Sequence, residues 1–263
     1  MPRGELDGWS YSYTDEGSGP ALIFNHGIQM DRTIWDEQID EFKASYRCVA
    51  IDAPGHGDSA PVPMGIDFYG YADMLIAIAQ QLGIDSAVWL GQSMGGFINL
   101  RLALRHADRV KGLVLIDTQA HSEAPEKLAQ YEAFLQVALQ DGVSDDLLNI
   151  LKLVYFGPTY ATKPEMETWE KKLQASDVPG QHAMIRAVFD RDDVHGRLSE
   201  IKAPAVVIHG EEDIAIEAER AEELARDLGA SVSVISGCGH CSPLERPDAV
   251  NPIIRSFLER IGY

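Results

Sequence analysis

The stretch that decides the fold is Gly91-Gln92-Ser93-Met94-Gly95. It matches the pattern Gly-x-Ser-x-Gly, which places a serine on a sharp turn between a strand and a helix. The apolar run Ala87–Leu90 predicts the strand, and Ser93–His106 predicts the helix. The flanking glycines permit the strained dihedrals and the close backbone approach that such a turn needs. The stretch therefore predicts that Ser93 is an exposed nucleophile.

On both sides of this turn, short apolar runs alternate with longer amphipathic segments. Strands that alternate with helices predict a parallel sheet covered on both faces, and the nearly continuous apolar run Val110–Ile116 is typical of a strand buried in this way. Further strands are expected at Trp9–Thr14, Ala21–Asn25, Tyr46–Ile51, Ala205–His209 and Ser231–Ile235. The matching helices are expected at Thr33–Phe42, Phe68–Leu82, Glu217–Leu228 and about Asp248 to Arg260, with Pro252 in the first turn of the last one.

Residues 119–195 carry only helical patterns, and this breaks the alternation. The helices expected there are Glu126–Leu139, Asp145–Val154, Glu165–Leu173 and Gly180–Phe189. We therefore predict an α/β core formed by residues 1–118 and 196–263, with residues 119–195 inserted as a helical cap. The cap aromatics are expected to pack mainly within it; they are Tyr131, Phe134, Tyr155, Phe156, Tyr160 and Trp169.

Four further blocks stand in order around the serine turn. They are Asn25-His26-Gly27-Ile28, Gly55-His56-Gly57-Asp58-Ser59, Gly210-Glu211-Glu212-Asp213 and Gly237-Cys238-Gly239-His240. Together with the turn they resemble the α/β-hydrolase family, and more closely its esterase and lactonase branch, which includes enol-lactonases and small carboxylesterases. The resemblance covers nearly the whole chain. It implies a mostly parallel central sheet flanked by helices, with an inserted cap.

A reacting carbonyl needs backbone N–H groups that stabilise the negative charge on its oxygen. One such donor is expected at Met94, the residue after the nucleophile. The resemblance implies that the second donor is Ile28, because in the family the residue that follows His-Gly supplies it. The apolar side chains of Ile28, Met30 and Met94 are expected to line an acyl pocket.

A nucleophilic serine also needs a base and an acid that orients the base. The chain order expected of a Gly-x-Ser-x-Gly hydrolase is serine, acid, histidine, and His240 follows the last predicted strand in a glycine-bracketed loop. The loop after Ala205–His209 offers Glu211, Glu212 and Asp213 as the acid. The resemblance favours Asp213, three residues after the glycine. Asp117, at the end of an earlier strand, is the alternative.

The net charge of the chain limits the kinds of partner that it is expected to bind. The chain has 263 residues and a formal net charge of −19, and such a field repels phosphate backbones and anionic membranes. We therefore expect a small-molecule partner, and neither nucleic acid nor a membrane. No apolar run approaches the ~18 residues of a membrane span, and the N-terminal stretch lacks the apolar core of a signal peptide. A cytoplasmic protein is expected, and nothing in the sequence predicts its oligomeric state.

Cys238 and Cys241 form a Cys-x-x-Cys pair around the candidate base. In redox proteins such a pair begins a helix near the start of a thioredoxin domain, whereas here it lies near the end of the chain. A zinc site would need further ligands at metal-binding spacing, and the sequence offers none. We expect neither a cofactor nor a metal ion.

The reaction predicted from these features is cleavage of a carboxylic ester or lactone through an acyl-enzyme intermediate. Carbon–carbon bond hydrolases of the same fold stay open as an alternative: they typically carry a tryptophan after the catalytic histidine, where this chain has Cys241, but Arg186 in the cap is compatible with them. Perhydrolase activity is a possible side reaction. An alternative of another class is a small-molecule receptor or sensor with slow or no turnover.

Overall fold

A computed structural model of the chain describes residues 2–263. Its strands are β1 (Arg3–Leu6), β2 (Trp9–Gly17), β3 (Ala21–Asn25), β4 (Arg47–Ile51), β5 (Ala87–Gln92), β6 (Val110–Ile116), β7 (Ala205–Gly210) and β8 (Ser231–Ile235). Its α-helices are α1 (Asp36–Phe42), α2 (Phe68–Gln81), α3 (Met94–Arg105), α4 (Pro125–Asp141), α5 (Asp145–Tyr155), α6 (Met166–Gln174), α7 (Val178–Phe189), α8 (Ala218–Leu228), α9 (Ser242–Glu245) and α10 (Pro247–Ile261).

All strands belong to one eight-stranded sheet with the order β1-β2-β4-β3-β5-β6-β7-β8. The pairs β1/β2 and β2/β4 are antiparallel, and every later pair is parallel. The predicted fold class, a mostly parallel central sheet with flanking helices, is confirmed. Because the strands from β3 to β8 run in one direction, the loops after β3, β5, β6, β7 and β8 meet at one edge of the sheet.

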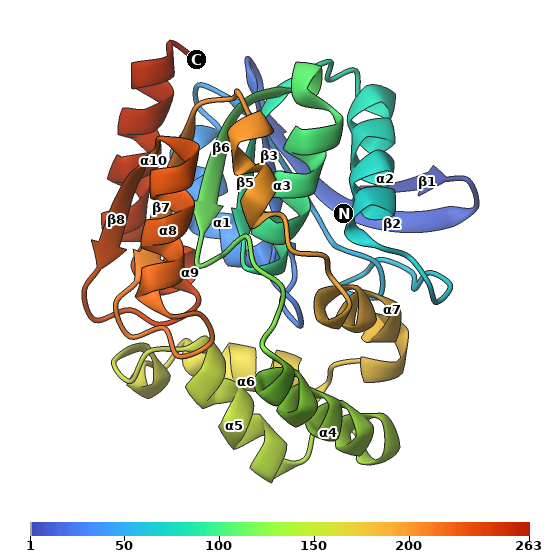
Figure 1. Ribbon diagram of the computed structural model, residues 1–263. Helices are drawn as coiled ribbons and strands as arrows, with labels where there is room; N and C mark the ends of the chain where they lie inside the picture. Colours follow the sequence, from blue (N-terminus) through green and yellow to red (C-terminus); the bar gives the residue numbers. More distant parts are fainter. Residues whose placement is uncertain (1) are drawn as a thin grey trace.

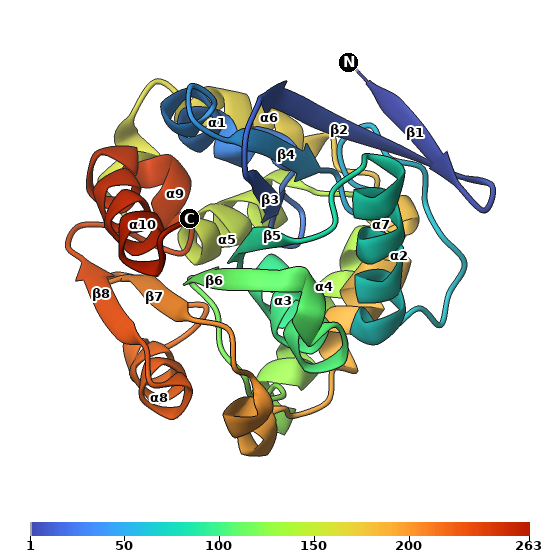
Figure 2. The same ribbon diagram turned by 90° about the horizontal axis from the view of Figure 1, so that it is seen from above.

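Side-chain alternation along the strands divides the core into two layers. Ile23, Trp89 and Leu113 face the helices α2, α3 and α8, whereas their neighbours Leu22 and Val88 face α1 and α10. Figure 2 shows these two groups of helices on opposite sides of the sheet. A strand with both faces covered buries nearly every side chain, which explains the apolar runs in the sequence.

The helices α4, α5, α6 and α7 lie together beyond the end of the sheet, in the lower part of Figure 1. The chain enters this group from the carboxyl end of β6 and returns through a 3₁₀ segment, His195–Glu200, to β7. The exact boundaries of core and cap, at 118/119 and 195/196, stay a prediction. No helix within residues 2–263 is both long and apolar enough to cross a bilayer.

Some predicted elements differ from the structure. The segment expected as one helix from Thr33 begins as a 3₁₀ turn, Arg32–Trp35, before α1. Pro252 lies in the interior of α10 and not in its first turn, because the helix begins at Pro247. The side chain of Pro252 is exposed, so the backbone carbonyl that loses its N–H partner lies on the solvent side of the helix. The short edge strand β1 was not predicted.

Candidate active site

Ser93 lies at the turn between β5 and α3 with φ of 52° and ψ of −114°, a strained conformation for a residue with a side chain. The N–H of Ser93 donates to the carbonyl of Ile116 at 2.9 Å, which fixes the turn against β6. The turn also packs against β3: a methyl group at Gly95 would come 2.0 Å from the carbonyl oxygen of Asn25. The predicted strand–turn–helix geometry is present, and Gly95 is required by this close approach.

The structure brings Ser93, His240 and Asp213 into one hydrogen-bonded chain. Nε2 of His240 lies 2.8 Å from Oγ of Ser93, and Nδ1 of His240 lies 2.7 Å from Oδ2 of Asp213. The other carboxylate oxygen of Asp213 accepts the N–H groups of Ala215 at 2.8 Å and Ile216 at 3.0 Å. Because both oxygens are held, the carboxylate keeps one orientation, and the N–H at Nδ1 of His240 leaves Nε2 free to face Ser93.

The environment of His240 controls its protonation. Its side chain is almost fully buried, and burial alone lowers the pKa of an imidazole. The charge of Asp213 and the hydrogen bond to it outweigh burial, so the pKa of His240 is raised above its ordinary value. The arrangement therefore favours the protonated form of His240, the form that a histidine base reaches when it takes a proton.

Asp117, the alternative acid, is buried nearby but makes no hydrogen bond to His240. Its Oδ1 accepts the N–H of Gly210 at 2.9 Å, and its Oδ2 accepts the N–H of Ser242 at 2.9 Å and the Ser242 hydroxyl at 2.8 Å. Burial, followed by the charge of Asp213, raises the pKa of Asp117. Through these hydrogen bonds, Asp117 connects the end of β6 to the loops that carry Asp213 and His240.

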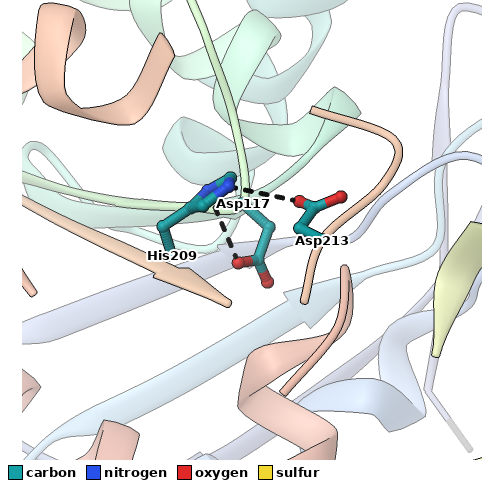
Figure 3. A group of neighbouring side chains, drawn as sticks. All are labelled: Asp117, His209 and Asp213. Carbon is teal, nitrogen blue, oxygen red and sulfur yellow. Dashed lines mark ion pairs between the residues drawn. The ribbon is translucent and has the colours of Figure 1, made fainter. Parts of the chain in front are cut away.

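Asp117, His209 and Asp213 form a compact group in which the ring of His209 lies 3.9 Å from Oδ1 of Asp117 and 3.6 Å from Oδ2 of Asp213 (Figure 3). Nε2 of His209 donates to the carbonyl of Ile216 at 3.0 Å. The carboxylate oxygens already accept hydrogen bonds from the backbone or from side chains, so the donor set suits a buried hydrogen-bond network better than a metal ion.

The remaining histidines have structural environments. His26 accepts the N–H of Ala53 at Nε2 and donates from Nδ1 to the carbonyl of Gly27, as expected of a loop-packing residue. His106 pairs with Asp73 at the end of α3. The other histidines are either buried, or lie outside the lining of the cavity described below; they are His56, His121, His182 and His195.

The expected oxyanion donors lie on two loops beside Ser93. Met94 begins α3, where the positive end of the helix dipole adds to the field of its N–H. Within residues 2–263, no protein acceptor pairs with the backbone N–H of Ile28 or of Met94. The loop of Ile28 lies directly over the turn, since a methyl group at Gly27 would come 3.2 Å from Cβ of Ser93. Both N–H groups are therefore available to a substrate oxygen.

A mostly apolar cavity opens over Ser93 and His240. Ile28 and Phe97 form part of its lining on the core side. The cap contributes apolar side chains from α4, α5 and α7; examples are Leu135, Leu147, Leu151, Val154, Val178, Ile185 and Val188. This lining suits an apolar acyl chain or ring.

Two of the three residues expected to line the acyl pocket do not reach the cavity. Met30 is 2% exposed and belongs to the buried cluster that contains Phe24 and Trp35, and Met94, at the start of α3, is fully buried in the other core layer. Only Ile28 lies in the lining. Residues that follow an active-site glycine or serine can direct their side chains into the core, and the pattern of residue types does not reveal this.

The aromatic residues of the cap divide between the cavity and the interior. Tyr131, Phe134, Tyr155 and Phe189 line the cavity. The other aromatics pack among buried residues of the second core layer; they are Phe156, Tyr160 and Trp169.

Sequence reasoning missed a charged pair in the cavity lining. Nη2 of Arg191 lies 3.0 Å from Oε2 of Glu123, and the guanidinium lies 4.3 Å from the centre of the Phe97 ring. The side chains are 1% and 11% exposed, so the pair is largely removed from water. The two residues are far apart in the sequence and carry no shared motif, so no local signal predicts their contact.

Cys238 and Cys241 are both buried free thiols on either side of His240. Burial, and then the charge of Glu245, raise the pKa of both thiols. A raised pKa disfavours the reactive thiolate.

Comparisons with known proteins agree with this geometry. A family model described as the alpha/beta hydrolase fold matches residues 20–247. A non-heme haloperoxidase from Rhodococcus erythropolis is 30% identical, with 96% of this chain and 97% of that protein covered. A thermophilic esterase from Thermogutta terrifontis superposes with a TM-score of 0.92 at 26% identity, covering 99% of each chain. An enol-lactonase from Burkholderia xenovorans LB400 superposes with a TM-score of 0.90 at 25% identity, covering 98% of this chain and all of that one.

Proposed function

This chain belongs to the α/β-hydrolase family, and from that premise we propose that it is a serine hydrolase that cleaves carboxylic esters or lactones through an acyl-enzyme intermediate. The observation that carries the proposal is the position of His240, 2.8 Å from the Ser93 hydroxyl and 2.7 Å from the Asp213 carboxylate. This is the spacing of a nucleophile, its base and the group that orients the base.

In the first half of the proposed reaction, Oγ of Ser93 attacks the carbonyl carbon while Nε2 of His240 accepts the hydroxyl proton. The carbonyl oxygen becomes negative and is stabilised by the N–H groups of Ile28 and Met94. The C–O bond to the leaving group then breaks, and His240 returns its proton to the departing oxygen. Ser93 is left as an acyl ester.

In the second half, a water molecule attacks the acyl ester. His240 now takes the proton of the water, the same N–H groups stabilise the oxygen again, and the bond to Oγ of Ser93 breaks as the proton returns to it. In a lactone the leaving oxygen stays attached to the acyl group, so ring opening leaves a hydroxyacyl ester on Ser93, and the attack of water on that ester releases a hydroxy acid. The same residues therefore serve esters and lactones.

The cavity supports an uncharged and largely apolar substrate. Its lining is mainly aliphatic and aromatic, and its charged pair, Glu123 and Arg191, is mutually neutralised. The formal net charge of −19 also disfavours a strongly anionic substrate. The likeness to an esterase and to an enol-lactonase agrees with this substrate class.

The contacts of Arg186 disfavour carbon–carbon bond cleavage. That alternative relied on Arg186 as a cap arginine, but the Arg186 guanidinium pairs with Glu132 and Asp190, and the residue does not line the cavity above Ser93. Arg191 is a cap arginine that does line the cavity, but its guanidinium is paired with Glu123. We therefore favour ester and lactone cleavage over the carbon–carbon reaction.

The proposal is tested by pre-steady-state turnover of short and long p-nitrophenyl esters and of a lactone panel, comparing the wild type with Ser93→Ala. We expect a burst of p-nitrophenol equal to the enzyme concentration in the wild type, and no burst in the variant. The order of rates along the ester series and the lactone panel then defines the acyl group. Turnover that is indifferent to Ser93, or no turnover of any carbonyl substrate, would contradict the proposal and favour a receptor.

A further inference from the structure

Glu245 is a buried carboxylate that lies beside the candidate catalytic site without touching the triad. Glu245 is 2% exposed. Oε2 accepts the N–H of Gly157 at 3.0 Å and the N–H of Gly239 at 3.1 Å, while Oε1 accepts the N–H of Cys241 at 3.2 Å. Three backbone donors offset the cost of burying one negative charge.

These three donors come from two different parts of the fold. Gly239 and Cys241 are the neighbours of His240 in the chain, so Glu245 binds the N–H of the residue before the histidine and the N–H of the residue after it. Gly157 belongs to the cap, directly after α5. A single carboxylate thus joins the cap to the loop that carries the base.

The contact between cap and loop is as close as two backbones can be. A methyl group at Gly157 would come 2.8 Å from the nitrogen of Gly239, and a methyl group at Gly239 would come 2.2 Å from the nitrogen of Gly157. Only glycine at both positions allows the two N–H groups to reach the same carboxylate oxygen.

The neighbouring cap residue, Tyr155, contacts the site at two further points. Its ring stacks on His240 with the ring centres 6.3 Å apart and an angle of 24° between the planes. Its hydroxyl donates to Oε1 of Gln29 at 2.8 Å, in the loop that carries Ile28. The end of α5 is therefore held to both the base and the oxyanion loop.

The backbone carbonyl of His240 is held from the nucleophile turn. Nε2 of Gln92 donates to the carbonyl oxygen of His240 at 2.6 Å. Gln92 and Oε1 of Glu245 therefore hold the carbonyl and the N–H of one peptide group, the one that joins His240 to Cys241.

We propose that Glu245 is a positioning residue which, by binding the N–H groups of Gly157, Gly239 and Cys241 together, makes the placement of His240 depend on the end of α5 in the cap. The inference rests on the proposed function of His240 as the base. A proton transfer over 2.8 Å is sensitive to small displacements of either partner, so loosening this carboxylate slows acylation while the cavity that binds substrate is retained.

The primary test is the variant Glu245→Gln, which replaces one carboxylate oxygen, a hydrogen-bond acceptor, with an NH₂ group, a donor. In the variant, the amide oxygen can still bind Gly157 and Gly239, but the NH₂ group then faces the N–H of Cys241. We expect kcat on a p-nitrophenyl ester to fall about tenfold to a hundredfold, while KM stays within about twofold, the pattern of a misplaced catalytic group. A merely structural role would lower thermal stability and leave the kcat of the folded fraction unchanged.

The matched control is Glu212→Gln. The Glu212 carboxylate also lies beside Gly157, since a methyl group there would come 3.1 Å from Oε2 of Glu212. Its side chain makes no hydrogen bond or ion pair with any residue in the range 2–263. The kcat and KM of the Glu212→Gln variant are expected to match those of the wild type.

A readout that needs no substrate is amide hydrogen exchange measured residue by residue. In the wild type we expect slow exchange at Gly157 and Gly239, and in Glu245→Gln faster exchange at both sites and at Cys241. The inference is overturned if exchange at these amides is the same in the two proteins.

A second variant approaches the same contact from the cap. Gly157→Ala keeps Glu245 and adds a methyl group 2.8 Å from the nitrogen of Gly239, so it displaces the His240 loop. We expect a loss of kcat similar to that of Glu245→Gln. If Glu245→Gln does not fold, Gly157→Ala serves as the test by itself. A folded Gly157→Ala protein with the kcat of the wild type then overturns the inference.

Labelling by a fluorophosphonate separates this inference from the proposed function. In that reaction Oγ of Ser93 bonds to phosphorus, fluoride leaves, and His240 takes the hydroxyl proton. If the wild type is not labelled at Ser93, the proposed function fails. If the wild type is labelled and Glu245→Gln is labelled at the same rate, only the positioning of His240 by Glu245 is overturned.

Discussion

Replacing Asp213 with asparagine changes the proton that His240 presents to Ser93. In the wild type, one oxygen of Asp213 accepts two backbone N–H groups and the other accepts the N–H at Nδ1 of His240. The amide oxygen of asparagine stays on the two backbone donors, so its NH₂ group faces His240 and donates to Nδ1. The ring proton then lies on Nε2, which faces Ser93 and can no longer accept its proton.

The size of the effect follows from this change of tautomer. Loss of the correct tautomer at intact geometry costs about 10⁴-fold in kcat in serine proteases. At about 1.4 kcal/mol for each factor of ten, the barrier rises by roughly 5.5 kcal/mol. Asp117 is not expected to replace the lost acid, because its oxygens already bind Gly210 and Ser242.

The assay is the initial rate of p-nitrophenyl ester hydrolysis over a pH series, with thermal unfolding followed for each protein. Asp117→Asn is the comparison: it disturbs the hydrogen bonds to Ser242, so we expect a lower melting temperature and a smaller loss of kcat than in Asp213→Asn. A folded Asp213→Asn protein that retains more than about a tenth of wild-type kcat would refute the reasoning, since the base would then be oriented by another group.

Three further predictions concern the pH profile, the turn and the thiols. Because Asp213 raises the pKa of His240, kcat/KM of the wild type should fall as pH drops through a value above 6.5; a midpoint below 6.5 would contradict this. Gly95→Ala places a methyl group 2.0 Å from the carbonyl oxygen of Asn25 in β3, so it should lower the free energy of unfolding, measured by urea titration, by about 3 kcal/mol. The control Gly196→Ala has open space around the added methyl group and should leave the free energy of unfolding nearly unchanged. Equal stability of the two variants would exclude the close packing at Gly95. Burial raises the pKa of the Cys238 and Cys241 thiols, so the native protein should keep full activity in iodoacetamide and react at these positions only once unfolded; rapid loss of activity would show that the thiols are accessible.

The order of the elements, the nucleophile and the base could be predicted from local rules, whereas the choice of Asp213 as the acid came from the family resemblance. The Gly-x-Ser-x-Gly turn requires a strand before it and a helix after it, and both are present at β5 and α3. Parallel strands bring their carboxyl ends to one edge, so residues after β5, β7 and β8 meet there. Ser93, Asp213 and His240 occupy these three loops.

The details that were missed depend on contacts between distant parts of the chain. The direction of the Met30 side chain is set by packing against Trp35 and not by its place near the nucleophile. The Glu123–Arg191 pair and the contact of Glu245 with Gly157 join residues 68 and 88 positions apart in the chain. A single sequence carries no periodicity or spacing that predicts such pairs. The prediction that Pro252 lies in the first turn was wrong, because Pro252 lies more than one turn after the start of α10 at Pro247.

The most direct test of the central claim is the mass of the intact protein after rapid acid quenching during turnover of a slowly deacylated ester. The account predicts that the protein gains the mass of one acyl group, that peptide mapping locates the group on Ser93, and that Ser93→Ala gains nothing. Efficient turnover with no covalent adduct at Ser93 under any quench time would contradict the account.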